Sequence, residues 1–423
     1  MDLRPHQLAA ADDLLTRVSR DGWAYLAGEV RVGKTLTVLE VARRLGVTRC
    51  LFLTKKKAIA SIEADRDALG LTDRVHVTNY EQVHKLVGHY DLLILDEAHC
   101  LGAYPKASLR ARQVAGELGY DRCILLSGTP SPESLSQLYH QIRIASAAGL
   151  STAVPWQQPS FYKWAAAGYV NVRTRRVGTG QEVNDYSDAN EALIMADLAP
   201  HMVRITQQQA GFQTQIIEQV HQVRMAPQTY ADTGKLMRDD VVTVGTGWPV
   251  VADTAAKQMQ KLRQMYSGTV IPENTFGTGI IFDTSKVDYI RKTFRGRLAV
   301  LYCFQAEGVM LRQAYGLLAT DSPEVFAARP HSVFIGQVQA SREGVNLSPA
   351  DDLVFLGIDY SALSYLQGRD RASALGRTVP PRVHWILAAN SLELKVYDKV
   401  RAKESYTAAH FRADRGSLSG KVG

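Results

Sequence analysis

Three short segments carry the residues of this chain whose types and spacing could do chemistry together. Residues 28–35 read GEVRVGKT and match the G-x-x-x-x-G-K-[ST] loop, whose backbone N–H groups surround nucleotide phosphates. Residues 96–99 read DEAH, and residues 127–130 read SGTP. In such a loop Lys34 would neutralise charge on the β- and γ-phosphates, and the Thr35 hydroxyl would ligate Mg²⁺. The segments therefore predict a site for a nucleotide and Mg²⁺.

The DEAH segment supplies two adjacent carboxylates at the end of a predicted buried strand, 91–95. Ligands of open α/β sheets bind at the carboxyl ends of the strands. Asp96 can hold the metal, directly or through water, while Glu97 can orient and deprotonate the attacking water. The alternative is an acidic pair on the surface. We expect Lys34, Asp96 and Glu97 to be catalytic, with Thr35 and Asp96 as metal ligands.

The elements that must position these residues alternate along the first part of the chain. Apolar runs of strand length occupy residues 23–27, 51–53, 75–77, 91–95 and 124–126. A helical pattern over 36–45 follows the phosphate loop. Strands that alternate with helices indicate a parallel sheet covered on both faces.

The pattern changes after residue 150 and then returns. Residues 193–202 look helical, residues 215–225 look like a strand, and a helix is expected over 254–266. Further strands are expected at 279–282, 298–304, 332–336, 352–356 and 383–387, which indicates a second α/β unit. The predicted division is a lobe over 1–150, an inserted helical or irregular region over 151–255, a second lobe over 256–411 and a flexible tail over 412–423.

Composition is typical of a soluble globular protein of two or three domains. The chain has 423 residues, 46% of them hydrophobic, and a net charge of +7. The positive charge favours a polyanionic partner without proving one. The four cysteines lie far apart with no C-x-x-C pair, so no zinc module is predicted. With no apolar run of membrane length, we expect no membrane partner and a location in the cytoplasm of a bacterium or a phage-infected host.

The DEAH and SGTP segments, in this order after the phosphate loop, resemble motifs II and III of superfamily 2 helicases and translocases. Residues 341–347, SREGVNL, resemble motif V, and residues 365–377, YLQGRDRASALGR, resemble motif VI in its Swi/Snf form. Residues 3–7, LRPHQ, resemble the entry motif whose glutamine reads adenine. The resemblance spans roughly residues 3–400 and looks most like compact phage or bacterial members.

The resemblance implies an α/β fold with two RecA-like parallel-sheet lobes in tandem. It implies ATP and Mg²⁺ as cofactors and DNA as the partner, whether duplex, forked, branched or single-stranded; replication or recombination proteins are candidate partners. The implied cofactor-binding residues are Gln7, Gly28, Arg31, Val32, Gly33, Lys34, Thr35 and Gly344. Motif VI would add Arg371 and Gln367 to the catalytic residues.

Other residues would connect hydrolysis to movement on DNA. By resemblance, His99, Ser127, Thr129 and Asn346 would couple the two, although capping of strand ends is the alternative for the first three. The expected nucleic-acid contacts are Lys55, Lys56, Thr78, Tyr80 and Ser341. A solvated charge run is the alternative for the lysines, and packing is the alternative for Tyr80. The aromatic residues of 156–169 could form a wedge or a stacking platform, but core packing is the favoured interpretation.

One position departs from the motif VI pattern. With Gln367 aligned, Arg371 takes the first arginine position and Ala374 takes the second. An arginine at the second position would stabilise charge on the γ-phosphate during hydrolysis. Arg371 alone could serve, or Arg377, Arg369 or Arg342 could substitute, or the chain could hydrolyse ATP weakly.

These observations favour an ATP-dependent DNA helicase or a translocase on double-stranded DNA. Three alternatives remain open. One is an ATP-gated DNA clamp with weak hydrolysis, suggested by Ala374, and another is an RNA helicase. The third is the motor component of a larger replication or recombination assembly.

Overall fold

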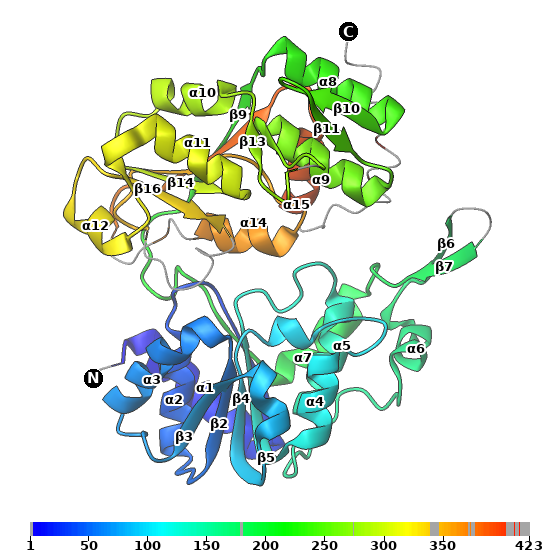
Figure 1. The fold of residues 1–423 in the computed structure, drawn as a ribbon. Helices are drawn as coiled ribbons and strands as arrows, with labels where there is room; N and C mark the ends of the chain where they lie inside the picture. The colour runs from blue at the N-terminus through cyan, green and yellow to red at the C-terminus, as the bar shows by residue number, and fades with distance from the viewer. Residues whose placement is uncertain are drawn as a thin grey trace. The chain divides into compact units, whose positions relative to one another are not determined.

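The computed structural model describes residues 3–177, 181–273, 275–338, 347–370, 373, 377–402, 410 and 414. The chain divides into two compact units, Met1–Phe212 (unit 1) and Gln213–Gly423 (unit 2). Each unit is an α/β structure built on its own parallel sheet, which agrees with the predicted tandem of RecA-like lobes. Figure 1 shows the elements of both units.

The described part of unit 1 contains a six-stranded sheet in the order β3-β2-β4-β5-β1-β8, with parallel pairing throughout. Its strands are β1 (Trp23–Gly28), β2 (Cys50–Thr54), β3 (Val75–Asn79), β4 (His89–Leu95), β5 (Gly119–Ser127) and β8 (Met202–Ile205). The five strands predicted before residue 150 are confirmed. Apolar residues dominate four of them because helices bury both faces of the sheet, whereas β3 at the sheet edge alternates, with His76 exposed between Val75 and Val77.

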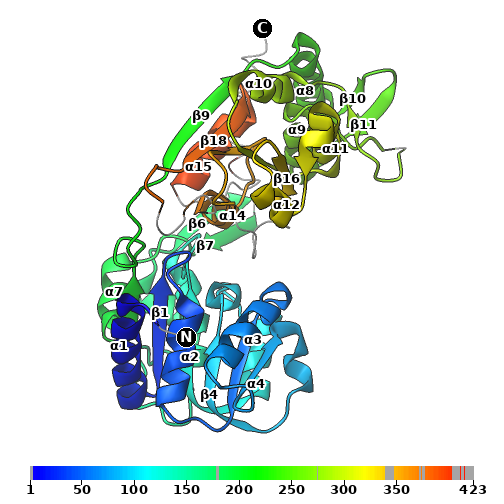
Figure 2. The ribbon, with the colours of Figure 1, turned by 90° about the vertical axis from the view of Figure 1, so that its left-hand side faces the viewer.

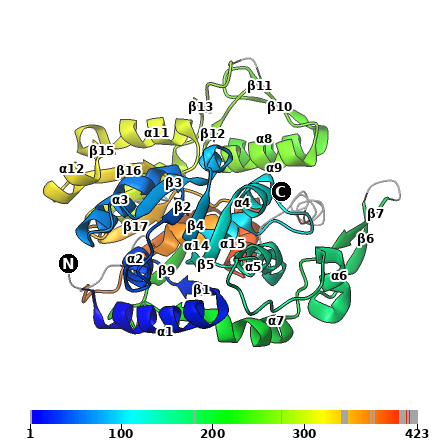
Figure 3. The ribbon, with the colours of Figure 1, turned by 90° about the horizontal axis from the view of Figure 1, so that it is seen from below.

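Alternate residues of each strand in unit 1 face two different layers of helices. Leu51 and Leu53 belong to one hydrophobic core, while Cys50 and Phe52 belong to the other. Helices α1 (Pro5–Asp21), α2 (Lys34–Arg44) and α3 (Ile59–Ala68) cover one face. Helices α4 (Leu109–Glu117), α5 (Leu138–Ala145), α6 (Phe161–Trp164) and α7 (Glu191–Leu198) cover the other. In Figure 3, α1 and α4 lie on opposite sides of the strands.

The described part of unit 2 repeats this architecture with the strand order β15-β16-β14-β17-β18-β9. The strands are β9 (Ile217–Val223), β14 (Leu298–Tyr302), β15 (Ala319–Thr320), β16 (Val333–Gln337), β17 (Asp352–Phe355) and β18 (Arg382–Ala388). Figure 2 shows β9 alongside β18 at the edge of the sheet. The predicted strands at 215–225, 298–304, 332–336, 352–356 and 383–387 are therefore confirmed.

Two layers of helices cover the second sheet as well. Helices α10 (Ser285–Thr293) and α11 (Gln305–Tyr315) pack on one face. On the other lie α8 (Pro227–Asp239), α9 (Ala255–Tyr266), α12 (Pro323–Ala328), α14 (Ala362–Arg369) and α15 (Leu392–Arg401). Two small antiparallel pairs complete the unit: β10 (Val241–Val244) with β11 (Trp248–Val251), and β12 (Thr269–Val270) with β13 (Ile280–Ile281).

Residues 151–255, expected to form an insert, are shared between the two units. Strand β8 pairs with β1 in the first sheet, and β9 pairs with β18 in the second. The helix predicted over 193–202 ends at Leu198, because the chain turns at 199–201 to enter β8. The strand predicted at 279–282 is the short β13, which pairs with β12 and lies outside the parallel sheet.

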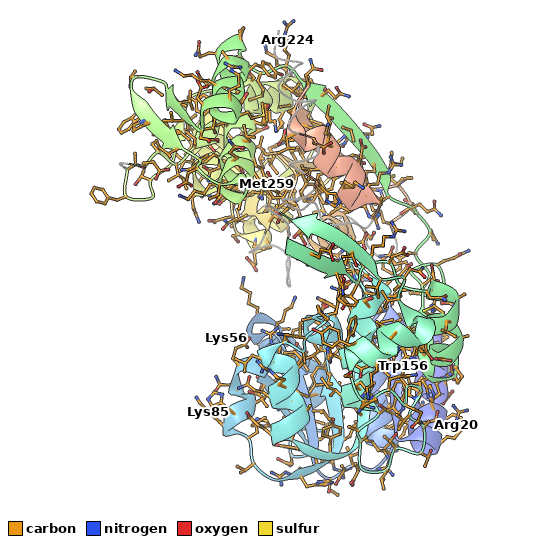
Figure 4. The ribbon with its side chains drawn as sticks, turned by 90° about the vertical axis from the view of Figure 1, so that its right-hand side faces the viewer. Arg20, Lys56, Lys85, Trp156, Arg224 and Met259 are labelled. Carbon is orange, nitrogen blue, oxygen red and sulfur yellow. The ribbon has the colours of Figure 1, made fainter. Side chains whose placement is uncertain are left out.

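The aromatic residues after position 155 mainly build the core of unit 1. Trp156, Phe161 and Trp164 are each no more than 2% exposed and pack around Tyr139 of α5, so core packing holds for them. Figure 4 shows Trp156 inside unit 1. Tyr162 is the exposed member of the group. Beyond them, β6 (Arg173–Val177) and β7 (Gln181–Asp185) form an antiparallel ribbon that extends away from the rest of unit 1 in Figure 1.

No helix among the described residues is both long and apolar enough to cross a membrane. The four cysteines are free thiols, with Cys50 and Cys123 fully buried.

Candidate functional site

The phosphate loop connects the end of β1 to the first turn of α2. Gly33 lies immediately before α2 with a φ of 82°, a conformation that glycine adopts without strain. Arg31 has a positive φ of 66° although it carries a side chain. Backbone held in such a conformation is concentrated at functional sites, because the surrounding structure must enforce it. The N-terminus of α2, which follows this loop directly, is the kind of position that suits a phosphate.

Helix α1 holds this loop in place. The Gln7 side chain donates through Nε2 to the carbonyl oxygen of Gly33 at 3.1 Å, and its Oε1 accepts from the Arg4 backbone N–H at 2.9 Å. His6 Nε2 lies 3.0 Å from the carbonyl oxygen of Val32. Gln7 is 2% exposed. Gln7 therefore supports the phosphate loop through Gly33, and its contact with adenine stays a prediction.

The Lys34 ammonium lies inside the loop. It donates to the carbonyl oxygens of Gly28 at 2.8 Å and Glu29 at 3.0 Å. A Cβ atom on Gly128 would lie 3.6 Å from Lys34 Nζ, so the SGTP segment borders the phosphate loop. Register explains this, because Ala27 of β1 pairs with Ser127 of β5. Thr35 follows in the first turn of α2 and is partly exposed, where its hydroxyl is accessible to a metal.

A segment that sequence reasoning missed braces the other side of the loop. The backbone N–H of Gln207 donates to the Glu29 carboxylate at 2.6 Å, and Gln207 Nε2 donates to the carbonyl oxygen of Val30 at 3.0 Å. These contacts come from the turn after β8, an element that the sequence did not predict. No short-range pattern signalled it, because β8 is separated from β1 by more than 170 residues of chain.

The Asp96 carboxylate lies where β4 ends and is held by neighbouring strands. Thr54, at the end of β2, donates to Asp96 Oδ2 at 2.7 Å, and the Tyr80 hydroxyl donates to the Asp96 carbonyl oxygen at 2.6 Å. Burial, followed by the charge of Glu97, raises the pKa of Asp96 to about 6. Thr54 and the positive charge of Lys34 act in the opposite direction. A bound cation would remove this electrostatic penalty, so the donor set fits Mg²⁺.

Few protein ligands are needed for such a metal. Among the described residues, no cluster of three or more His, Cys, Asp or Glu side chains could hold an ion. Mg²⁺ is commonly bound through one or two carboxylates together with substrate phosphates and water. Asp96 with Thr35 matches that pattern.

Glu97 adopts a left-handed backbone conformation, with a φ of 50°, directly after Asp96. Its Oε2 lies 3.1 Å from His99 Nδ1, and the same nitrogen lies 3.0 Å from Ser127 Oγ. Burial lowers the pKa of His99, so the imidazole is neutral near pH 7. His99 therefore connects the DEAH segment to the SGTP segment inside unit 1.

A polar network continues this connection into the core. Ser127 Oγ accepts the backbone N–H of Thr129 at 3.0 Å. The Tyr25 hydroxyl, which also neighbours Ser127, donates to Gln141 Oε1 at 2.8 Å. Gln141 Nε2 then donates to the carbonyl oxygen of Pro130 at 2.9 Å. The sequence analysis missed Tyr25 and Gln141. The signal that could have identified them is a side chain with a polar group in a mainly buried element, β1 for Tyr25 and α5 for Gln141.

The expected nucleic-acid contacts of unit 1 differ in exposure. Lys56 is exposed, as Figure 4 shows, Lys55 and Thr78 are partly exposed, and all three could reach a phosphate. Tyr80 is 2% exposed, and Arg110 lies 5.3 Å from the centre of its ring. Tyr80 therefore packs in the core of unit 1, which was the alternative for this residue, and a ring so little exposed is not placed to stack on a base.

Most of motifs V and VI lies outside the described residues: Ser341, Arg342, Gly344, Asn346, Arg371 and Ala374. Gln367 belongs to α14, of which the backbone is described at this position. Arg369 forms an ion pair with Asp370 at 2.8 Å. Arg377 donates to three carbonyl oxygens, those of Val379, Ser348 and Ala350, at 2.9–3.2 Å. Both arginines would have to break existing contacts to act on a nucleotide.

Part of the chain is similar in sequence to known ATPases and helicases. A segment is 28% identical over 102 residues to the human Lymphoid-specific helicase, and this match covers 23% of this chain and 12% of that protein. Another match is 34% identical over 82 residues to the Chromatin-remodeling ATPase INO80 of Lodderomyces elongisporus, covering 19% of this chain and 5% of the relative. The corresponding protein of Saccharomyces cerevisiae is 31% identical over 83 residues, or 20% of this chain and 5% of the relative.

These relatives are far longer than the segments that match, so the similarity concerns one part of each. No family model matches this chain.

Proposed function

We propose that this chain is an ATP-hydrolysing motor on DNA, acting as a helicase or as a translocase on double-stranded DNA. The proposal places it with the compact, Swi/Snf-like members of superfamily 2 that carry a DEAH segment. The observation that carries it is one site at the carboxyl end of the unit 1 sheet, where Lys34, the Asp96–Glu97 pair and the SGTP segment lie together.

The residues of this site divide the work of phosphate-bond hydrolysis. Lys34 and the α2 N-terminus would bind the terminal phosphates and offset their charge. Thr35 and Asp96 would hold Mg²⁺, which when bound neutralises charge on the β- and γ-phosphates. Glu97 would accept a proton from the attacking water at its carboxylate. The neutral His99 would keep Glu97 in position. Because His99 also contacts Ser127, a change at Glu97 would affect the SGTP segment as well.

The similarity to proteins named as a helicase and as chromatin-remodelling ATPases supports DNA as the polymer. The positive net charge of +7 is compatible with it. Lys55, Lys56 and Thr78 remain the proposed contacts to the DNA backbone in unit 1.

An ATP-gated DNA clamp that hydrolyses little is the second candidate. The observation that favours it is the commitment of Arg369 to Asp370 and of Arg377 to backbone carbonyls. Neither side chain is then available to replace the arginine missing at Ala374. Under this alternative, ATP binding without turnover would control affinity for DNA.

Phosphate release from ATP distinguishes the two. It is measured without polymer and then with single-stranded DNA, duplex DNA and RNA, with Lys34→Ala as the inactive control. Stimulation by DNA that the control lacks is the result expected for a motor. DNA binding that depends on ATP, with no turnover on any polymer, would select the clamp. Stimulation by RNA alone would reject both.

A further inference from the structure

Three hydrogen bonds join the phosphate loop to the segment that follows β8. The backbone N–H of Glu29 donates to the carbonyl oxygen of Ile205 at 2.9 Å. The Glu29 carboxylate accepts the backbone N–H of Gln207 at 2.6 Å, and Gln207 Nε2 donates to the carbonyl oxygen of Val30 at 3.0 Å. The last of the three depends on the side chain at position 207, so a substitution there can remove it and leave the other two in place.

The segment that contains Gln207 folds into a turn of its own, which ends at Phe212, the last residue of unit 1. The Thr206 backbone N–H donates to Gln209 Oε1 at 2.8 Å, and the Gln209 backbone N–H donates to Thr206 Oγ1 at 3.2 Å. The Phe212 backbone N–H donates to the carbonyl oxygen of Gln207 at 2.9 Å. Ala210 is 4% exposed and Phe212 is partly buried, and both pack in the core that α1, α2 and α3 cover. Because the turn has these contacts of its own, it is able to hold the phosphate loop in place.

Side chains hold most of the carbonyl oxygens of the phosphate loop. Within residues 28–33, Lys34 holds the first two, two side chains of α1 contact the last two, and Gln207 holds that of Val30 between them. A carbonyl oxygen carries partial negative charge and would repel a phosphate. A loop whose carbonyl oxygens are held by donors of the protein is therefore in a form that can receive an anion.

Lys34 is the donor of this set that the proposed function assigns to the terminal phosphates. An ammonium that binds phosphate would leave the first two carbonyl oxygens of the loop, whereas Gln207 can stay on Val30. Arg31 follows Val30 with a φ of 66°. A residue with a side chain keeps such a conformation only where the surrounding contacts enforce it. The contact of Gln207 with Val30 lies directly beside that position and does not depend on Lys34.

We propose that Gln207 is a positioning residue of the nucleotide site, which keeps the phosphate loop in the form that receives the terminal phosphates. It acts through the carbonyl oxygen of Val30, from a position 177 residues further along the chain. The inference rests on the proposed function, since it takes ATP as the ligand of the loop.

Gln207→Glu is the variant that tests this role. The two side chains have nearly the same size, but a carboxylate cannot donate to the carbonyl oxygen of Val30 and would lie near the Glu29 carboxylate. Gln207→Lys keeps a donor on a side chain of similar length and should restore the contact. Gln208→Glu is the matched control for the added negative charge, because Gln208 is exposed and its side chain makes no hydrogen bond within the part of the chain that the structure describes.

The first measurement is hydrogen exchange of the backbone amides of residues 28–35 in the nucleotide-free chain. Gln207→Glu should speed this exchange about tenfold, since a loop that loses a hydrogen bond opens more often. Gln207→Lys and Gln208→Glu should exchange as the wild type does. Exchange in β4 should be the same in all samples, which would show that unit 1 stays folded. Equal loop exchange in Gln207→Glu and the wild type, or an equal increase in Gln208→Glu, would overturn the proposal.

The second measurement is the Kd for a non-hydrolysable ATP analogue with Mg²⁺, by calorimetry on the same chains. Gln207→Glu should raise the Kd about tenfold, because the apparent affinity falls with the fraction of chains whose loop is ready to bind. Gln207→Lys should restore the affinity, and Gln208→Glu should leave it unchanged. Faster loop exchange with an unchanged Kd would reject a role of Gln207 in nucleotide binding. If the wild type bound no analogue while loop exchange responded as expected, the proposed function would fail and the support of the loop by Gln207 would stand.

Discussion

The two units share a parallel-sheet architecture but use their buried polar groups differently. In unit 1 these groups gather where the strands end: Asp96 has a raised pKa, and Glu97 and Arg31 adopt left-handed backbone conformations. In unit 2 two buried acidic side chains, Glu393 and Asp352, are instead paired with cations of the same unit. The contrast separates groups that the fold keeps ready for a ligand from groups that hold the fold together.

The Lys286–Glu393 pair is the clearest case in unit 2. Both side chains are almost fully buried, and Lys286 Nζ donates to the two Glu393 oxygens at 2.9 and 2.7 Å and to the carbonyl oxygen of Leu356 at 3.1 Å. Glu393 also accepts the backbone N–H of Ala388 at 2.6 Å. Such a pair joins α10, α15 and the ends of β17 and β18, and it leaves no acceptor for a substrate.

A hydrogen-bonded network that contains two histidines holds another part of unit 2 together. His221 of β9 contacts the Tyr289 hydroxyl and His384 of β18, each at 2.9 Å, and His384 contacts Asp352 at 2.9 Å. Arg382 completes the chain through two hydrogen bonds to Asp352. Burial, followed by the charge of His384, lowers the pKa of His221. This network fixes the edge strand β9 to the sheet.

The largest expected effect is on ATP turnover at the proposed site of unit 1. Glu97→Gln keeps the size and backbone of the residue but removes its basicity, so ATP turnover should fall by at least about a hundredfold. Phosphate release measures the change, and thermal unfolding should show a folded chain. Turnover within a few-fold of the wild type would mean that Glu97 is not the base.

The next effect concerns stability in unit 2. Lys286→Met leaves Glu393 buried without its cation, which should lower the free energy of unfolding by roughly 3–5 kcal/mol. Urea unfolding followed by tryptophan fluorescence is the measurement. Adding Glu393→Leu to Lys286→Met should restore much of the loss, since two apolar side chains then replace the pair. If the double variant were as unstable as the single one, packing at this position would explain the loss.

A smaller effect depends on pH. A carboxyl group whose pKa rises from 3.8 to about 6 on folding binds its proton more tightly in the folded chain, so it contributes less stability as pH rises through this range. Asp96→Asn should therefore stabilise the ligand-free chain at pH 8 by about 3 kcal/mol and have little effect at pH 4. Urea unfolding at the two pH values compares them. An equal difference at both would exclude the carboxyl group as its cause.

The smallest effect tests the network behind the SGTP segment. Tyr25→Phe removes one hydroxyl and should cost about 1 kcal/mol of stability. It should lower the kcat of DNA-stimulated turnover several-fold with little change in the KM for ATP, because Tyr25 does not line the phosphate loop. Gln141→Leu should have a similar effect, and a double variant should add little to either. Additive losses would show that the two side chains act separately.

Much of the fold could be predicted because local patterns determine it. The continuous apolar runs of β2, β4 and β14 indicated buried strands before any tertiary contact was known, since only a sheet covered on both faces needs them. The strand β8 was missed because four residues between a helix and a turn carry too little pattern. It is a strand only because β1 offers an unpaired edge to it.

The residues of the candidate site divide in the same way, into those that local sequence patterns identify and those that depend on partners far away in the chain. Lys34, Asp96 and Glu97 were identified from their spacing, and the structure places them with Ser127 at one edge of the sheet. Thr54, Gln207, Tyr25 and Gln141 could not be identified, since each acts through a partner distant in sequence. Tyr80 was assigned to DNA, but its ring is in the core.

The sequence by itself determined the parallel-sheet units and the residues proposed to bind a nucleotide, because strand periodicity and the phosphate-loop pattern are local properties. Only the tertiary structure decided which polar groups support those residues and which remain unpaired. Hydrogen bonds between strands far apart in the chain depend on sheet order and register. For that reason the contact of Gln207 with the phosphate loop became visible only in the folded chain.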